Sequence, residues 1–177
     1  MKRLGAARVG DVLAEWGEHE VEGRLLERKR VPRGYLDQFI GPRRRLEAIR
    51  VLLQVRLPVV AAILAANPTE WVAVEVSKDD VPSIRVMHAR TLIDYSRSKL
   101  IEAGESGDWV RQLAGGAADV AGPVLAIARS LPGPITIFDG LHRMAAWVAH
   151  LEAGRHYPVH VTVAVTPEIA PQFEMPP

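Results

Sequence analysis

The segment 135–165 limits the fold of this chain more than any other part of its sequence. A short β-branched run, residues 135–138, ends in Asp139-Gly140, and apolar residues then recur at helical spacing. Strict alternation of valine with other residues follows over 157–165. The segment therefore predicts a strand, a glycine turn, an amphipathic helix and a second strand. The expected buried residues are Met144, Trp147, Val148 and Leu151 on the helix, which Gly154 ends, and Val159, Val161, Val163 and Val165 on the strand.

Composition limits the class of protein. The 177 residues are 48% hydrophobic and carry a net charge of +1, which suits one full core and does not indicate a polycation that searches for nucleic acid. There is no cysteine, so disulfides, thiolate zinc sites and cysteine nucleophiles are excluded. The N-terminus shows no signal peptide, and the longest apolar run, 57–66, is about half of the roughly 20 residues that span a bilayer. We expect a cytoplasmic protein without a membrane partner.

The pattern of apolar residues changes near Asn67-Pro68, from helical spacing to the alternation typical of strands. Before that point, 9–30 and 43–66 have helical spacing, with a bend expected at Pro58. The sequence therefore predicts a helical N-terminal extension over 1–68, an α/β (α+β) domain over 69–166 and a loosely held Pro-rich tail over 167–177. Within the domain we expect strands at 71–76, 83–87 and 122–128, and helices over 91–114 with an interruption at Gly104-Glu-Ser-Gly107.

The turn after residue 138 brings together groups that suit an anion. A helix N-terminus exposes backbone N–H groups and the positive end of the helix dipole. Gly140 allows close backbone approach, and Arg143 offers a planar fork for phosphate. His142 can donate to a phosphate oxygen or carry a proton near neutral pH. Asp139 could orient His142, accept a hydroxyl proton or hold a magnesium ion.

A purely structural interpretation of the same turn stays open. Asp139 could cap the helix, while His142 and Arg143 solvate its first turn. However, an arginine in a first turn opposes the helix dipole, so a helix built only for stability would carry Asp or Glu there.

The motif resembles a known family. The segment 135–163 is similar to the signature of the ParB/sulfiredoxin-like superfamily. It contains Ile-Phe-Asp-Gly-Leu-His-Arg, an expected alanine-rich helix, a glycine and then Tyr-Pro-Val-His-Val. The strands expected at 71–76 and 122–128 fall where that fold has its earlier strands, so the resemblance covers about 70–165. It implies a small mixed sheet flanked by helices, in which the turn binds nucleotide phosphates.

The branches of this superfamily differ in chemistry. Sulfiredoxins require a cysteine where this chain has Leu141. Chromosome-partition members have an acidic–Arg–Arg form of the motif and a helix-turn-helix domain, for which residues 166–177 are too few. The motif is most similar to that of free serine kinases, which phosphorylate a small hydroxyl compound with ATP or ADP. This resemblance assigns Asp139, Gly140, His142 and Arg143 to the phosphate and catalytic site. It also implies an acidic base after the first strand, for which the candidates are Glu75, Asp79, Asp80 and Asp94.

Two function classes follow. The first is a nucleotide-dependent phosphotransferase or phosphohydrolase that uses Mg²⁺ with ATP or ADP, or CTP. The amides of Gly140, Leu141 and His142 and the Arg143 fork would hold the phosphates, and Asp139 or His142 would handle the proton. The second is a non-enzymatic nucleotide-sensing or nucleic-acid-associated module. A nuclease-like activity has less support.

Other charged and aromatic residues give weaker signals. Ser96-Arg97-Ser98-Lys99 could bind a phosphate but is more typical of an exposed helix start. His156 and His160, about 13 Å apart on a strand, are too distant to share a metal. A basic N-terminal patch offers one route to nucleic acid, although interspersed acidic residues favour an ordinary solvated face. This patch contains Arg24, Arg28, Lys29, Arg30, Arg33 and Arg43-Arg-Arg45. The tryptophans are expected to be core or packing residues: Trp16, Trp71, Trp109 and Trp147.

Overall fold

Alternating valines form the centre of the sheet. In the computed structural model, strand β2 (Glu70–Val76) pairs antiparallel with β7 (Val159–Val165). Val72 lies opposite Val163, and Val74 opposite Val161, and these side chains are almost fully buried. Because side chains alternate across a strand, one face of each strand is apolar and packs into the core. The strand predictions for 71–76 and 157–165 are confirmed, the second with a later start.

The structure describes residues 1–8, 11–12, 41, 70–87, 90–120 and 122–167. The predicted helices at 9–30 and 43–66, the bend at Pro58 and the tail beyond residue 167 lie almost entirely outside these residues. The contacts divide the chain into two compact units, one of Met1–Ala6 with Thr69–Pro177 and the other of Ala7–Pro68. Only the first of these units is described below.

The described strands make one mixed seven-stranded sheet in the order β1-β2-β7-β5-β6-β3-β4. Pairing is parallel between β3 and β6 and between β5 and β7, and antiparallel between the other neighbours. This mixed α/β architecture confirms the coarse fold class. The remaining elements are β1 (Lys2–Ala6), a 3-10 helix (Lys78–Ser83), β3 (Ile84–Val86), β4 (Arg90–Thr91), α4 (Leu92–Ile101), α5 (Glu105–Gly115), β5 (Leu125–Ala128), β6 (Ile135–Asp139) and α6 (Leu141–Glu152).

Strand β1 is a difference from the sequence-based prediction. Residues 2–6 were grouped with the helical N-terminal extension, but they form an edge strand antiparallel to β2. Its side chains are mostly exposed, and Arg3 pairs with Glu70 at 2.8 Å across the strands. A short, charged strand of this kind suits a sheet edge, where unpaired backbone groups would otherwise invite another chain.

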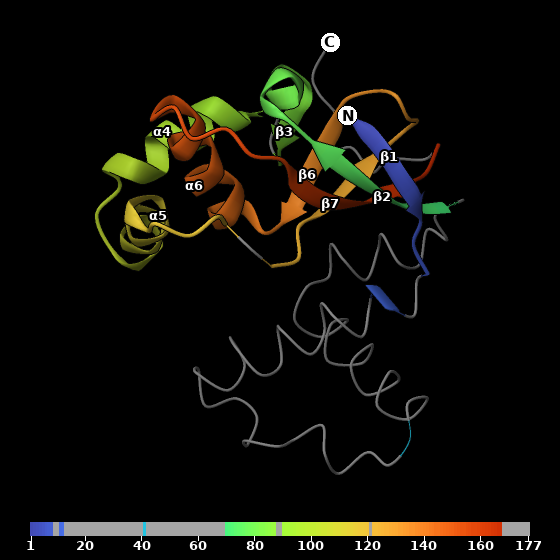
Figure 1. Ribbon diagram of the computed structural model, residues 1–177, viewed down its shortest axis with the longest axis horizontal. Coiled ribbons are helices and arrows are strands. Elements are labelled where there is room, and N and C mark those ends of the chain that lie inside the picture. Colours follow the sequence, from blue (N-terminus) through green and yellow to red (C-terminus); the bar gives the residue numbers. More distant parts are fainter. Residues whose placement is uncertain (9–10, 13–40, 42–69, 88–89, 121, 168–177) are drawn as a thin grey trace. The chain divides into compact units, whose positions relative to one another are not determined.

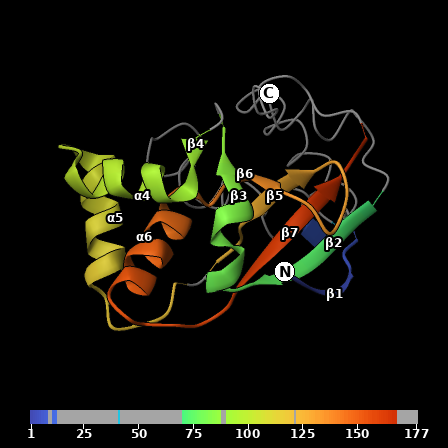
Figure 2. The same ribbon diagram turned by 90° about the horizontal axis from the view of Figure 1, so that it is seen from above.

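Three helices lie together on one side of the described sheet, with β1 at its opposite end (Figures 1 and 2). Helix α6 contributes the predicted Met144, Trp147, Val148 and Leu151 to the core, and all four are buried. Gly154 follows the helix with φ +82°, which confirms it as the terminator. No described helix is long and apolar enough to cross a membrane.

Candidate functional site

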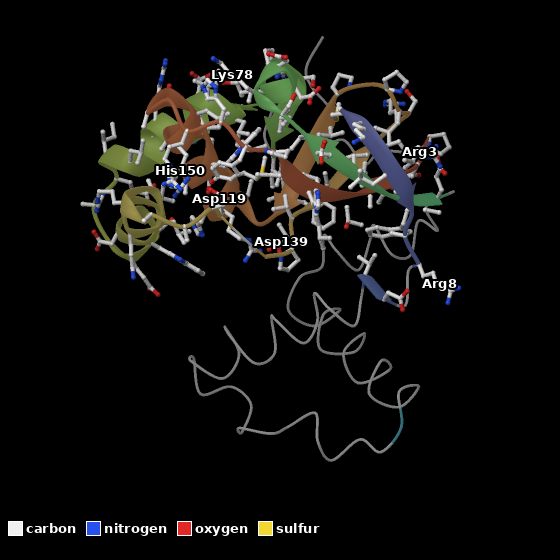
Figure 3. The ribbon with its side chains drawn as sticks, in the orientation of Figure 1. Arg3, Arg8, Lys78, Asp119, Asp139 and His150 are labelled. Carbon is white, nitrogen blue, oxygen red and sulfur yellow. The ribbon has the colours of Figure 1, made fainter. Side chains whose placement is uncertain are left out.

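The turn between β6 and α6 requires a glycine for two reasons. Gly140 is the N-cap of α6 and has left-handed backbone angles, φ 79° and ψ 17°. A Cβ atom at this position would lie 2.9 Å from the Pro123 carbonyl oxygen and 3.0 Å from Val124 Cγ2. The glycine therefore lets the chain reverse while the loop before β5 packs directly against it. Asp139, which is labelled in Figure 3, is the last residue of β6 and directly precedes this turn.

Arg143 and Asp139 are turned towards the protein. The guanidinium of Arg143 donates from Nη2 to the Pro123 carbonyl and lies 3.7 Å from Asp139 Oδ2. The two side chains are only 11% and 9% exposed. A Cβ at Gly122 would lie 3.2 Å from Arg143 Nη1, so the guanidinium also covers this loop. Arg143 thus fastens the 122–124 loop to the start of α6, with Asp139 beside its guanidinium, and the role of both groups at a ligand stays a prediction.

His142 makes a contact that the sequence did not predict. Its Nε2 lies 2.7 Å from the Oγ of Ser106, and its ring lies 5.4 Å from that of Trp109, centroid to centroid, with a tilt of 33°. Ser106 and His142 are each the second residue of their helices, α5 and α6. The starts of the two helices therefore meet at these side chains. We call Ser106, Trp109, Gly140, Leu141 and His142 the α5–α6 junction.

Ser106 and Trp109 are the junction residues that sequence reasoning missed. The available signal was the break at Gly104-Glu-Ser-Gly107, which indicated a new helix start but not its neighbour in space. Trp109 was expected to be a core or packing residue; 42% of its surface is exposed, so it lies outside the core, and its ring packs against His142. Trp71 and Trp147, by contrast, are buried as predicted. Only packing of α5 against α6 brings the serine and the tryptophan to His142.

Ser96 and Arg97 do not join this junction. Ser96 is fully buried, and its hydroxyl donates to the Ala145 carbonyl at 2.7 Å, which fastens α4 to α6. Arg97 is exposed and forms an ion pair with Glu152 at 3.0 Å. The structure thus places the first in helix packing and the second on the surface, and neither is in contact with the turn.

The candidate bases on and after β2 also lie elsewhere. Glu75 is on β2, three strands from β6 in the sheet order, which corresponds to about 14 Å. Its carboxylate lies 3.8 Å from Lys2 Nζ and 3.7 Å from His160 Nε2. Asp79 is exposed on the 3-10 helix. The described contacts of Glu75 and the position of Asp79 lie outside the junction, and the base that the family resemblance implies stays a prediction.

Asp80 and Asp94 serve as local caps. Asp80 accepts from the N-terminal ammonium of Met1 and from the backbone N–H of Ser77. Burial alone would raise the pKa of Asp80, but these hydrogen bonds and the ammonium charge outweigh it and hold the pKa below its usual 3.8. Asp94 lies at the start of α4, where the hydroxyl of its N-cap Thr91 bonds both its N–H and its carboxylate.

Asp139 has no carboxylate or histidine neighbours arranged as a metal site. Among the described residues, no three His, Asp or Glu side chains are grouped closely enough to hold a metal ion.

Comparisons with protein-family models, curated proteins and solved structures found no match. The resemblance to the ParB/sulfiredoxin-like superfamily therefore rests on the residues of 135–163. A function for this chain has to come from the chemistry of its own side chains.

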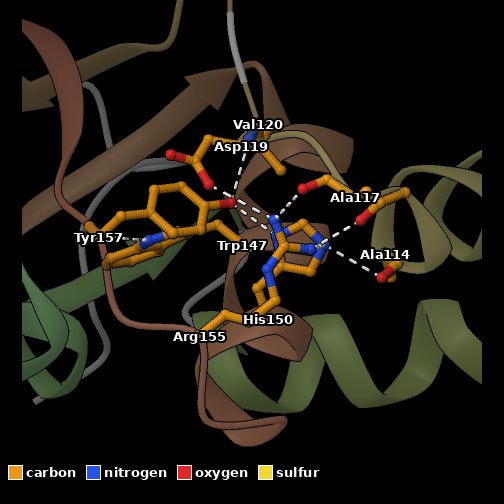
Figure 4. Close-up of polar contacts among 9 residues, drawn as sticks. Ala114, Ala117, Asp119, Val120, Trp147, His150, Arg155 and Tyr157 are labelled. Carbon is orange, nitrogen blue, oxygen red and sulfur yellow. Dashed lines mark hydrogen bonds and ion pairs between the residues drawn. The ribbon is translucent and has the colours of Figure 1, made fainter.

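A second polar cluster closes the far end of α6 (Figure 4). His150 is 1% exposed; its Nε2 lies 3.0 Å from the Ala114 carbonyl, and its Nδ1 lies 2.6 Å from the Tyr157 hydroxyl. The Nη1 of Arg155 lies 3.1 Å from the same Nε2 of His150. The Tyr157 oxygen in turn accepts from the Val120 N–H at 3.0 Å. Burial raises the pKa of Tyr157 above 10.0.

Arg155 completes this cluster. Its guanidinium donates to the carbonyls of Gly116 and Ala117 at 2.6 and 2.8 Å, and it lies 3.4 Å from Asp119 Oδ1. Together with His150 it ties the 114–120 loop to the C-terminal end of α6. Because these bonds join the end of α5 and residues 116–119 to the end of α6, we interpret the cluster as structural support for α5 and α6.

Proposed function

We propose that this chain binds the phosphates of a nucleotide at the α5–α6 junction and transfers a phosphoryl group to the hydroxyl of a small molecule, or to water. The observation that carries the proposal is the meeting of two helix starts at one histidine, His142, behind a left-handed glycine turn. A ParB/sulfiredoxin-like fold is part of the same proposal. It is supported by the mixed sheet and by the strand–turn–helix order around Gly140.

The electrostatics of the junction favour an anion. Each helix N-terminus acts as roughly half a positive charge, and an anion placed there gains about 0.3–1 kcal/mol. The first turn of α6 contains no acidic residue, whereas that of α5 contains Glu105 and Asp108. The start of α6 is therefore the stronger of the two anion sites. The amides of Leu141 and His142 would hold the phosphate oxygens there.

The side chains divide the remaining roles. His142 would take the proton of the acceptor hydroxyl, because none of the predicted carboxylate bases lies at the junction. The exposed ring of Trp109 offers a surface on which a nucleobase can stack. Arg143 and Asp139 keep the 122–124 loop against Gly140, so that the turn has its shape before a ligand arrives. Magnesium would neutralise phosphate charge as it does in other phosphoryl transfers.

A binding experiment tests the proposal first. ATP, ADP or CTP with magnesium at 100 times its dissociation constant should stabilise the protein by about 2.7 kcal/mol. For a chain of this size that corresponds to a rise in melting temperature of roughly 5–10 °C. His142→Asp should abolish the rise without loss of helix stability, because a carboxylate in a first turn suits the dipole but repels phosphate. His156→Asp, at an exposed histidine outside the junction, is the matched control. Equal shifts in both variants would reject the site.

A turnover experiment tests the reaction. Incubation with nucleotide, magnesium and a pool of hydroxylated metabolites that includes free serine should release the product nucleotide and a phosphorylated acceptor. Loss of both products in His142→Ala would place the chemistry at the junction.

One observation favours a second function, nucleotide binding without turnover. Asp139 and Arg143 lie against each other and the 122–124 loop, and the predicted carboxylate bases are elsewhere. A binding module needs neither group to reach the reacting atoms. A melting-temperature rise with no product in the turnover experiment would support this function over the kinase.

A further inference from the structure

The hydroxyl of Ser106 lies beside an imidazole, unlike those of four other described serines. Ser83, Ser96 and Ser98 donate to backbone carbonyls at 2.7, 2.7 and 2.8 Å, which are ordinary structural bonds. Ser77 donates to the Asp80 carboxylate at 3.0 Å within a helix cap. The Oγ of Ser106 instead lies 2.7 Å from the Nε2 of His142. A hydroxyl within hydrogen-bond reach of an imidazole is the arrangement of a nucleophile with its general base.

The surroundings hold both side chains in place. Gly107 lies so close to the end of α4 that a Cβ there would sit 2.1 Å from the Glu102 carbonyl oxygen, which fixes the start of α5. The Trp109 ring lies against that of His142 and restricts its rotation. Ser106 is only partly buried, so part of the residue is exposed to solvent.

We propose that Ser106 is a covalent nucleophile that accepts a phosphoryl group, with His142 as its general base. The inference rests on the proposed function for its physiological donor, a nucleoside triphosphate. The Ser106 oxygen attacks the terminal phosphorus, and a new O–P bond forms as the bond to the bridging oxygen breaks. The hydroxyl proton passes to His142 Nε2, and the nucleoside diphosphate leaves with the electron pair. No oxidant or reductant is required.

The product of this step suits its position. A phosphate on Ser106 would lie at the N-terminus of α5 and beside the first turn of α6, where backbone N–H groups and the helix dipoles favour negative charge. The protonated His142 would face it as a counter-charge. The phosphoserine would then pass its phosphoryl group to the acceptor hydroxyl or to water. Transfer should therefore follow ping-pong kinetics, with the diphosphate released before the acceptor binds.

Labelling of the full chain tests the inference with two phosphorus donors. The first is ATP labelled on its terminal phosphate, with magnesium, and the second is a fluorophosphonate probe, which needs no nucleotide site. Peptide mapping should place both labels on Ser106, and Ser106→Ala should remove them. His142→Gln should slow labelling at least tenfold, because the amide can still accept a hydrogen bond but cannot take the proton. Ser98→Ala, at a partly buried serine of α4, should label like the parent.

The outcomes separate this inference from the proposed function. Nucleotide binding and turnover without a label on Ser106 from either donor would overturn the covalent step and leave the proposed function intact. A fluorophosphonate label that depends on His142, in a chain that shows no nucleotide stabilisation, would retain the nucleophile and reject the nucleotide. Equal labelling of the parent and His142→Gln would overturn the role of the histidine.

Discussion

Replacement of Gly140 by alanine tests whether the turn before α6 is built around the absence of a side chain. At φ +79° an L-residue costs about 1–2 kcal/mol relative to glycine. The new methyl group would also lie 2.9 Å from the Pro123 carbonyl oxygen and 3.1 Å from Val124 Cα. Both atoms belong to backbone, which cannot rotate away, and overpacking of this kind costs about 1–3 kcal/mol. We expect Gly140→Ala to lower the free energy of unfolding by about 2–5 kcal/mol.

A second glycine supplies the control for this prediction. Gly154, at the C-terminal end of α6, has nearly the same angle, φ +82°, but a Cβ there would meet no atom within 4 Å. Gly154→Ala should therefore show only the backbone cost of about 1–2 kcal/mol. Urea denaturation of the two variants and the parent measures both losses. If the two losses are equal, the 123–124 loop does not press on the turn and the packing derived for it is wrong.

Three further stability predictions follow from single residues. Burial raises the pKa of Tyr157, so its neutral hydroxyl contributes stability below pH 10.0, and this contribution is lost as pH rises through the folded pKa. Urea denaturation across the alkaline range should therefore show a smaller loss of stability in Tyr157→Phe than in the parent. The lowered pKa of Asp80, in which hydrogen bonds and the N-terminal charge outweigh burial, stabilises the fold above pH 3.8 and is lost as pH falls through the folded pKa. Asp80→Asn should therefore lose less stability on acidification than the parent. An equal loss of unfolding free energy in both proteins as pH falls would contradict this. Ser96→Ala removes a buried hydrogen bond and should lower the free energy of unfolding by about 0.5–1.5 kcal/mol in thermal denaturation. Arg97→Ala breaks an exposed ion pair and should lower it by about 0–1 kcal/mol. A larger loss in Arg97→Ala would contradict the difference in burial between the two residues.

Local patterns predicted the elements of the described domain well. The alternating valines of 159–165 and the apolar stripe of 141–152 place their residues in the core by periodicity alone. Element ends were less well predicted. Helix α6 begins at Leu141, directly after left-handed Gly140, a start that the spacing of the apolar residues did not fix. Strand β5 begins at Leu125, after Gly122 with φ +110° and Pro123, which has no N–H for the sheet.

Contacts between distant parts of the chain could not be predicted from such patterns. Residues 2–6 carry too little alternation to indicate a strand, and only their pairing with β2 makes them one. Arg143 has a guanidinium suited equally to a phosphate or to a carbonyl, and the position of Pro123 brings a carbonyl within its reach. The break at 104–107 gave no sign that Ser106 would meet His142.

Sequence by itself determined the apolar faces of the main strands and of α6 and where the chain turns, since both depend on neighbours a few positions away. The glycine turn, the core valines and the apolar face of α6 all belong to this group. The tertiary structure alone decided which polar groups face each other, because hydrogen bonds reach only about 3 Å and depend on how whole helices pack. That packing of α5 on α6 set a serine beside a histidine, and the proposed chemistry follows from it.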